Sequence, residues 1–159
     1  MPEFAIESNG RLEKTAVYMN GEQMRGIKEI FFNLDENGTF DAIIQYEGYD
    51  GKIHTKRIFK DQLNSLKFSP PAFTAEESKH LNLLQVDSDG DIENTTVAFN
   101  GEMLDGLVSM FLHLRSSTAP ETGILDIFSN NEYDTEAAIF KTEFVFRDLD
   151  DTLSREQIF

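Results

Sequence analysis

The sequence predicts an all-β, mainly antiparallel protein built from two tandem repeats of a β-meander of about four strands. Three observations support this: a repeat at an offset of 80 residues, an Asn-Gly dipeptide at the same place in each copy, and segments in which apolar and polar residues alternate. A Pro-containing linker and a short helix are expected between the copies. The expected boundaries are 1–68 for the first lobe, 69–85 for the linker and helix, and 86–159 for the second, acidic lobe.

The repeat is clearest where residues 7–34 are compared with residues 87–114, because 11 of these 28 positions are identical. Roughly two identities would be expected by chance at average composition. Farther along, pairing 58–61 with 145–148 raises the offset to 87, so the extra residues are expected in loops, mainly in 115–122. The pattern predicts two similar lobes related by a pseudo-twofold axis. Identical positions include Ser8 and Ser88, Gly10 and Gly90, Thr15 and Thr95, Asn20-Gly21 and Asn100-Gly101, and Gly26 and Gly106.

The local structure follows from turn and cap signals. Asn-Gly predicts a type I′ hairpin, because both central residues of that turn need positive φ. Residues 27–34 and 107–114 fit a strand by alternation and also fit a helical period. The strand is favoured, since a helix through either segment would include a glycine that costs about 1 kcal/mol. A helix is expected over 75–84, because Thr74-Ala75-Glu76-Glu77 has the form of a capping box.

Four apolar residues at equivalent positions of the two copies are predicted to form the interface between the lobes. They are expected on the face opposite the core stripe, and related lobes often pack through equivalent faces. The alternative is that both faces of each sheet are partly covered. The four residues are Ile27, Phe31, Leu107 and Phe111.

Composition excludes several classes of site. The chain has no cysteine, so disulfides, thiolate metal sites and cysteine nucleophiles are absent. No apolar run reaches the ~18–20 residues that a membrane span requires. The formal charge of −15 repels nucleic acid and anionic membranes, so neither is expected as a partner. The first residues do not resemble a signal peptide, and a cytoplasmic location is expected.

The negative charge is concentrated in the second half of the chain. Residues 1–80 carry 10 basic and 13 acidic side chains, whereas residues 81–159 carry 4 and 16, so the net charges are −3 and −12. Two acidic clusters stand out, one opening the second repeat and one following its last predicted strand. We expect them to bind a basic protein partner, with the chain itself a monomer or small homo-oligomer. The clusters are Asp87, Asp89, Asp91 and Glu93, and Asp148, Asp150 and Asp151.

Metal, cofactor and catalytic motifs do not emerge. An EF-hand loop counted from Asp87 would have Ile92 at position 6 and Ala98 at position 12, where glycine and glutamate are needed. The acidic loop segments are therefore interpreted as turns. The histidines His54, His80 and His113 lack a short metal-ligand spacing. No catalytic, cofactor-binding or metal-binding residue is assigned.

The sequence thus favours a non-catalytic, acidic protein-binding or adaptor module, for example an inhibitor that presents a negative surface to a basic target. The alternative is a self-associating structural subunit of a phage-like or other assembly, whose strand edges pair between chains. A third hypothesis is an enzyme with a carboxylate cleft between the lobes.

Overall fold

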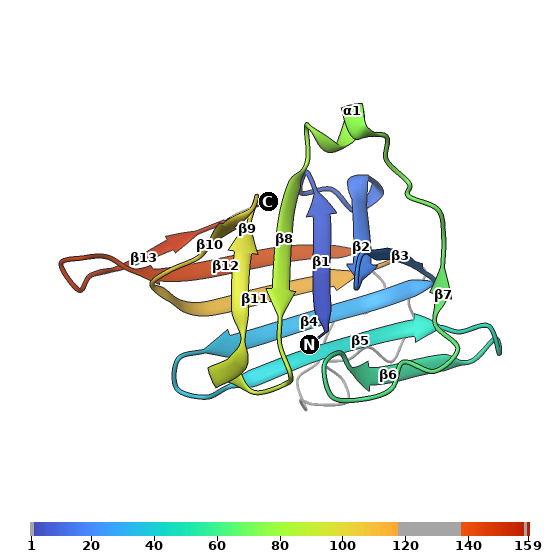
Figure 1. Ribbon diagram of the computed structural model, residues 1–159, viewed down its shortest axis with the longest axis horizontal. Coiled ribbons are helices and arrows are strands. Elements are labelled where there is room, and N and C mark those ends of the chain that lie inside the picture. Colours follow the sequence, from blue (N-terminus) through green and yellow to red (C-terminus); the bar gives the residue numbers. More distant parts are fainter. Residues whose placement is uncertain (1, 118–137, 158) are drawn as a thin grey trace.

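The computed structural model describes residues 2–117, 138–157 and 159, which form two antiparallel sheets packed face to face (Figure 1). The strands of one sheet run crosswise to those of the other, as in an orthogonal sandwich. The all-β antiparallel class is therefore confirmed. No helix in the described part of the chain is long and apolar enough to cross a membrane.

The strand order of each sheet is as follows. The seven-stranded sheet runs β10 (Glu102–Met103), β9 (Thr96–Phe99), β8 (Asn82–Asp87), β1 (Glu3–Ser8), β2 (Thr15–Met19), β3 (Glu22–Arg25) and β7 (Lys67–Phe68). The six-stranded sheet runs β13 (Leu153–Glu156), β12 (Ile139–Arg147), β11 (Leu107–Arg115), β4 (Ile27–Asp35), β5 (Phe40–Glu47) and β6 (Ile53–Arg57). The helical elements are the 3₁₀ turns η1 (Leu12–Lys14) and η2 (Ile92–Asn94) and the helix α1 (Ala75–Ser78).

Both sheets contain strands from both halves of the chain. At their centres β1 pairs with β8 and β4 pairs with β11. Ala5 lies opposite Gln85 in the first pair, and Phe32 lies opposite Leu112 in the second. Both are pairs of residues 80 apart, so a pseudo-twofold axis passes through the two sheets at these points. Segments 1–68 and 86–159 consequently share both sheets and one core, and neither half forms a single meander, because its first three strands lie in one sheet and its next three in the other.

Strand register corrects the offset expected beyond residue 114. Ile27 pairs with Tyr46 and its counterpart Leu107 pairs with Phe146, so the later strands correspond at an offset of 100. The ring contacts agree, because Phe40 packs on Phe59 and Phe140 packs on Phe159. The offset of 87 was wrong because it rested on chance similarity between short sequence segments, which does not show how the strands pair. The extra residues lie between β11 and β12, where residues 116–138 take the place of 36–39.

The predicted turns are confirmed, and the predicted helix is confirmed at its start. Asn20 and Gly21 have φ of 52° and 84°, and their counterparts Asn100 and Gly101 have 51° and 85°, as type I′ turns require. Helix α1 has the expected capping box, but it ends at Ser78. Strand β8 begins soon afterwards, because its side chains at 84 and 86 are buried when it pairs with β1. The ambiguous segments 27–34 and 107–114 are strands, as favoured above.

Serine and threonine residues that are identical in the two repeats form the same buried hydroxyl contact in each repeat. The Ser8 and Thr15 hydroxyls lie 2.7 Å apart, as do those of Ser88 and Thr95. Each serine Oγ also accepts a hydrogen bond from the backbone N–H of the glycine two residues later. Both serines are fully buried, and a buried hydroxyl must be hydrogen-bonded. This requirement gives a physical reason for the repeated Ser, Gly and Thr.

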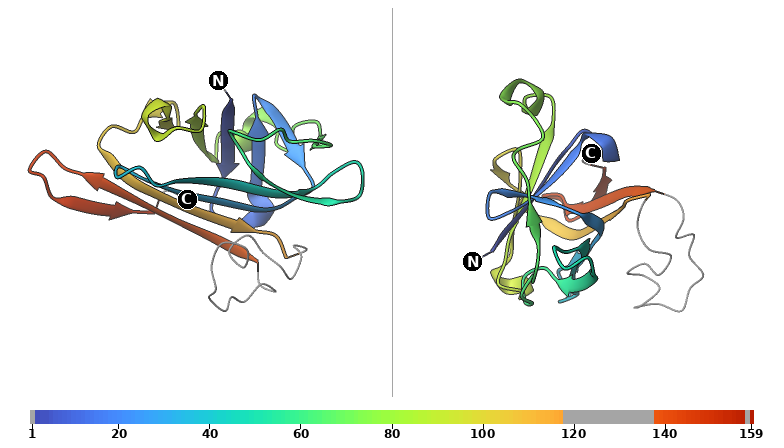
Figure 2. Two further views of the ribbon diagram at one scale, coloured as in Figure 1. Left: turned by 90° about the horizontal axis from the view of Figure 1, so that it is seen from below. Right: turned by 90° about the vertical axis from the view of Figure 1, so that its right-hand side faces the viewer.

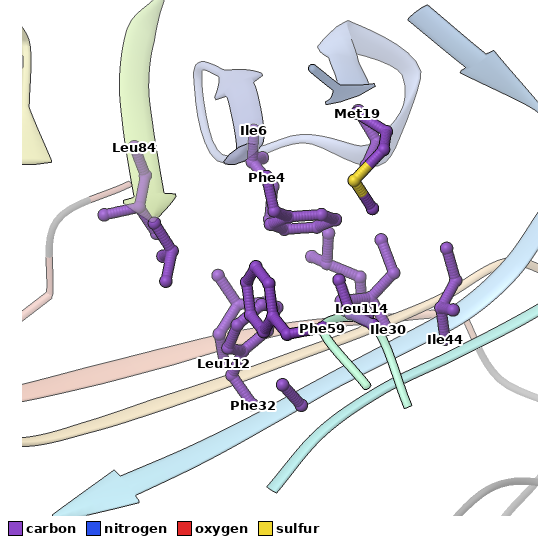
Figure 3. Close-up of a cluster of buried hydrophobic side chains, with 14 of the residues drawn as sticks. Phe4, Ile6, Met19, Ile30, Phe32, Ile44, Phe59, Leu84, Leu112 and Leu114 are labelled. Carbon is purple, nitrogen blue, oxygen red and sulfur yellow. The ribbon is translucent and has the colours of Figure 1, made fainter. Parts of the chain in front are cut away.

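The core fills the space between the sheets (Figure 3). Phe32, beside the pseudo-twofold axis, packs against Phe4 of the other sheet with ring centroids 5.0 Å apart. Phe59, which follows β6, also packs against Phe32, with the ring centroids 6.2 Å apart. Residues from both halves enter this one cluster, so burial of apolar area couples their folding.

The four residues expected at a lobe interface are divided between two faces. Phe31 and Phe111 lie on the outer face of the six-stranded sheet, where their rings meet edge-on at 5.7 Å across the β4–β11 pair. Ile27 and Leu107 instead pack against the main core. The reason is a β-bulge after each of them, in which one extra residue reverses the alternation of the strand.

Gly26 permits the chain to pass from one sheet to the other, and its replacement by alanine is expected to destabilise the fold. It has φ of +79°, and an added Cβ would lie 2.7 Å from the Glu47 carbonyl oxygen. At Gly21, φ is +84° and no atom would lie within 4 Å of an added Cβ. Alanine there should cost only the strain of a left-handed backbone, about 1–2 kcal/mol. Urea unfolding of Gly26→Ala should therefore show a larger loss of stability than Gly21→Ala. Equal losses of stability in the two variants would contradict the close approach of position 26 to the Glu47 carbonyl oxygen.

Candidate functional site

Three acidic connections lie at one end of the sandwich, which we call the acidic end: β4–β5 (36–39), β8–β9 (88–95) and β12–β13 (148–152) (Figure 2, left). The β4–β5 turn lies between the other two. Asp35 and Glu36 share a pocket of about 300 Å³ with Ile92 and Thr95. On the other side, Glu36 Oε1 lies 2.6 Å from Arg147 Nη2 at the end of β12. The two acidic clusters of the sequence therefore flank one turn.

Six of the seven predicted partner-binding residues belong to this end. The exception is Asp87, which lies within β8 opposite Glu3 of β1. Alternation along β8 buries Leu84 and Val86 in the core, so Asp87 lies on the opposite, outer face of the seven-stranded sheet. The residues at the acidic end are Asp89, Asp91, Glu93, Asp148, Asp150 and Asp151.

The β8–β9 connection is a tight turn held by its own polar groups. Asp89 Oδ1 accepts the Asp91 backbone N–H at 3.0 Å, and Asp89 Oδ2 accepts the Asn94 side-chain amide at 2.8 Å. The hydrogen bond from the Asp91 backbone lowers the pKa of the Asp89 carboxyl. Asp91 directs its carboxylate to Lys60 Nζ at 3.5 Å. The turn assigned from the sequence is confirmed.

The β12–β13 connection is held in a similar way. Asp150 Oδ1 accepts the Thr152 hydroxyl at 2.6 Å, which is the main reason that the pKa of the Asp150 carboxyl is lowered. Arg147 donates from Nη1 to Asp151 at 2.9 Å and from Nη2 to Glu36. These interactions fix the acidic hairpin next to the β4–β5 turn.

A groove of about 590 Å³ separates the β8–β9 turn from the end of β6. Its lining is mixed, with charges of both signs beside apolar side chains, so it suits a side chain with an apolar stem and a charged head. Its lining includes Phe40, Ile43, Phe59 and Ile92 among apolar residues, and Asp41, Arg57, Lys60, Asp91 and Glu93 among charged ones.

The pseudo-twofold axis relates two of the three acidic connections, β8–β9 and β12–β13, to the β1–β2 and β5–β6 connections, which have a similar backbone and different charge. Asn9 takes the place of Asp89, and its side chain accepts the Arg11 N–H at 3.1 Å in the same turn. Gly48 and Gly51 take the places of Asp148 and Asp151, and they make the same turn hydrogen bond at 3.0 Å, compared with 2.9 Å. These turns therefore form without the negative charges. The acidic end, with the groove and pocket that adjoin it, has ten carboxylates and three cations, a formal charge of −7: Asp35, Glu36, Asp41, Asp105 and the six predicted residues against Arg57, Lys60 and Arg147.

A second polar cluster, which sequence reasoning missed, lies on the outer face of the six-stranded sheet. Glu29, His113 and Arg115 are buried, with His113 Nε2 2.5 Å from Glu29 Oε2 and Arg115 Nη1 3.0 Å from Glu29 Oε1. The histidine also meets Phe31 edge-on at 5.8 Å. No repeat signal marks this cluster, because its equivalents are Ser109, Asn33 and Asp35. Only the pairing of β4 with β11 brings the three together.

The other histidines have ordinary surroundings. His54 lies 3.0 Å from Asp50 and stacks on Tyr46 at 5.2 Å. In the part of the chain that the structure describes, no three His, Asp or Glu side chains are grouped so as to hold a metal ion. Comparisons with protein-family models, curated proteins and solved structures gave no match.

Proposed function

We propose that this protein is a non-catalytic binding module that contacts a basic protein through its acidic end. The observation that carries the proposal is the comparison with the symmetry-related end. Asparagine and glycine support the same turns there, so the aspartates at 89, 148 and 151 exceed what the fold requires. Charge that the fold does not need is available to interact with another molecule.

The arrangement of the charges supports a protein partner. The three cations of the acidic end already have carboxylates. Lys60 lies at Asp91, Arg147 at Asp151 and Glu36, and Arg57 at Asp61. The remaining carboxylates give a negative field that speeds encounter with a positive surface. The apolar side chains in the groove beside Asp91 and Glu93 provide a place for the stem of a lysine or arginine from the partner.

Neutralising the β8–β9 cluster tests this proposal. The variant Asp89→Asn/Asp91→Asn/Glu93→Gln is expected to bind a basic partner on the order of tenfold more weakly, because three charges at the edge of a contact are lost. Its folding should be retained, since Asn9 makes the equivalent turn. The measurement is capture of proteins from an extract at low and high salt, followed by titration calorimetry of each purified captured protein.

The matched control is Glu13→Gln/Glu22→Gln/Glu76→Gln, which removes the same charge at exposed sites outside the acidic end. It should bind as the unmodified protein does. If the two triple variants bind equally, or if binding does not weaken as salt rises, the acidic end is not the contact surface.

A further inference from the structure

We propose that copies of this chain associate head to tail, with edge strand β6 of one copy pairing with edge strand β13 of the next to continue the six-stranded sheet. This self-association goes beyond the proposed binding function, and the two surfaces share only the β12–β13 connection with Asp150 and Asp151. β6 and β13 are the two ends of the strand order, and among the described residues neither has a strand on its outer side. Their hairpins project from opposite sides of the sheet (Figure 2, left).

The strand directions permit antiparallel pairing of β6 with β13 of a second copy that is turned to follow the twist of the sheet. All neighbours in the sheet are antiparallel and the sheet has six strands, so β6 and β13 run in opposite directions. A copy moved sideways across the strands therefore presents β13 antiparallel to β6, and the alternation continues. Because the two contacting edges differ, the contact is heterologous and can repeat along an open chain.

Both edges expose apolar side chains at positions related by the pseudo-twofold axis. Ile53 of β6 is 44% exposed and its counterpart Leu153 of β13 is 57% exposed. At the hairpin tips, Tyr49 is 66% exposed and Leu149 is fully exposed. Four of the six large apolar side chains found exposed in the described part of the chain thus belong to these two hairpins. Burial of these side chains between copies would supply part of the association free energy.

Charge decides which edges pair. Residues 50–57 carry three basic side chains and one acidic one, a net +2, whereas residues 148–156 carry four acidic and one basic, a net −3. Charges on edge strands normally prevent sheets from joining. Here they oppose β6–β6 and β13–β13 contacts, which the pseudo-twofold backbone would otherwise allow equally, and they leave β6–β13 attractive.

Antiparallel pairing also places the charges opposite one another. Near the end of β6, Lys56 faces the start of β13 and the preceding Asp150 and Asp151. The next residue, Arg57, is held within its own chain by Asp61, 3.0 Å from the guanidinium. At the other end of the contact, Lys52 faces Glu156. The strands have only five and four residues, so the interface is small, and we expect weak, concentration-dependent association.

Sedimentation of the whole chain over a wide concentration range tests the inference. At about 10 mM salt, where the Debye length is about 30 Å, the mean mass should rise with protein concentration, and at about 1 M salt it should fall towards the monomer. Lys52→Glu/Lys56→Glu makes both edges negative, and Asp151→Asn/Glu156→Lys removes the net charge of the β13 edge. Each variant alone should remain close to the monomer mass at low salt.

An equal mixture of the two variants should restore pairwise association, because the native, acidic β13 of the first variant then meets the native, basic β6 of the second. The control Lys14→Glu/Lys79→Glu, with the same charge change at exposed sites away from both edges, should associate as the unmodified protein does. A monomeric unmodified protein at all concentrations, or a mixture no larger than its components, would overturn the inference. Loss of partner binding in the Asp89/Asp91/Glu93 variant is a separate result, because that variant leaves both edges unchanged.

Discussion

Replacement of Glu29 by glutamine is expected to lower the free energy of unfolding by about 3–5 kcal/mol, the usual result of breaking a buried ion pair. Glu29 and Arg115 have fully buried side chains, and the carboxylate contacts both Arg115 and His113. Glutamine keeps the size of the side chain and removes its charge. The arginine, which does not lose its proton in proteins, then keeps its buried charge without this carboxylate. Urea unfolding followed by circular dichroism measures the loss.

The same substitution at an exposed pair provides the control. Glu143 lies 2.6 Å from Arg155, but both side chains are more than half exposed, so Glu143→Gln should cost less than about 1 kcal/mol. A double variant Glu29→Leu/Arg115→Met should recover much of the loss, since apolar groups of similar size can replace a buried ion pair at little cost. A Glu29→Gln protein as stable as Glu143→Gln would contradict the buried cluster.

Phe32→Ala is expected to reduce stability by about 3–5 kcal/mol, because the cavity adds to the lost burial of the ring. Phe32 lies beside the pseudo-twofold axis, is 1% exposed, and contacts Phe4 and Phe59. These contacts join the two sheets, so the surrounding side chains cannot easily close the cavity. The loss should appear as a lower urea midpoint with an unchanged slope.

Tyr49→Ala is the comparison for this aromatic deletion. Tyr49 lies at a hairpin tip and is 66% exposed, so its removal should change stability by no more than about 0.5 kcal/mol. Comparable losses for the two variants would mean that Phe32 does not occupy the centre of a tightly packed core.

Local chemistry in the sequence determined much of the fold. The Asn-Gly pairs specify two-residue hairpins because few residues tolerate positive φ twice in succession. Alternation identified 27–34 and 107–114 as strands, and Thr74 with Glu77 identified the start of the helix. The sequence also located the acidic turns, since aspartate there bonds to its own backbone neighbours. These features depend on residues a few positions apart, so they can be predicted from the sequence alone.

Contacts between distant segments were decided by the tertiary structure alone. The pairing of β1 with β8 and of β4 with β11 merges the two repeats into shared sheets, and it assembles Glu29, His113 and Arg115 from strands more than 80 residues apart. A bulge of one residue sends Ile27 and Leu107 to the core. Burial of a common core determines the strand register, the bulges and the order of the strands. None of these can be read from a local pattern in the sequence. The sequence by itself therefore determined the elements and the charge of this protein, whereas the packing of the two sheets decided where that charge lies and which edges remain open.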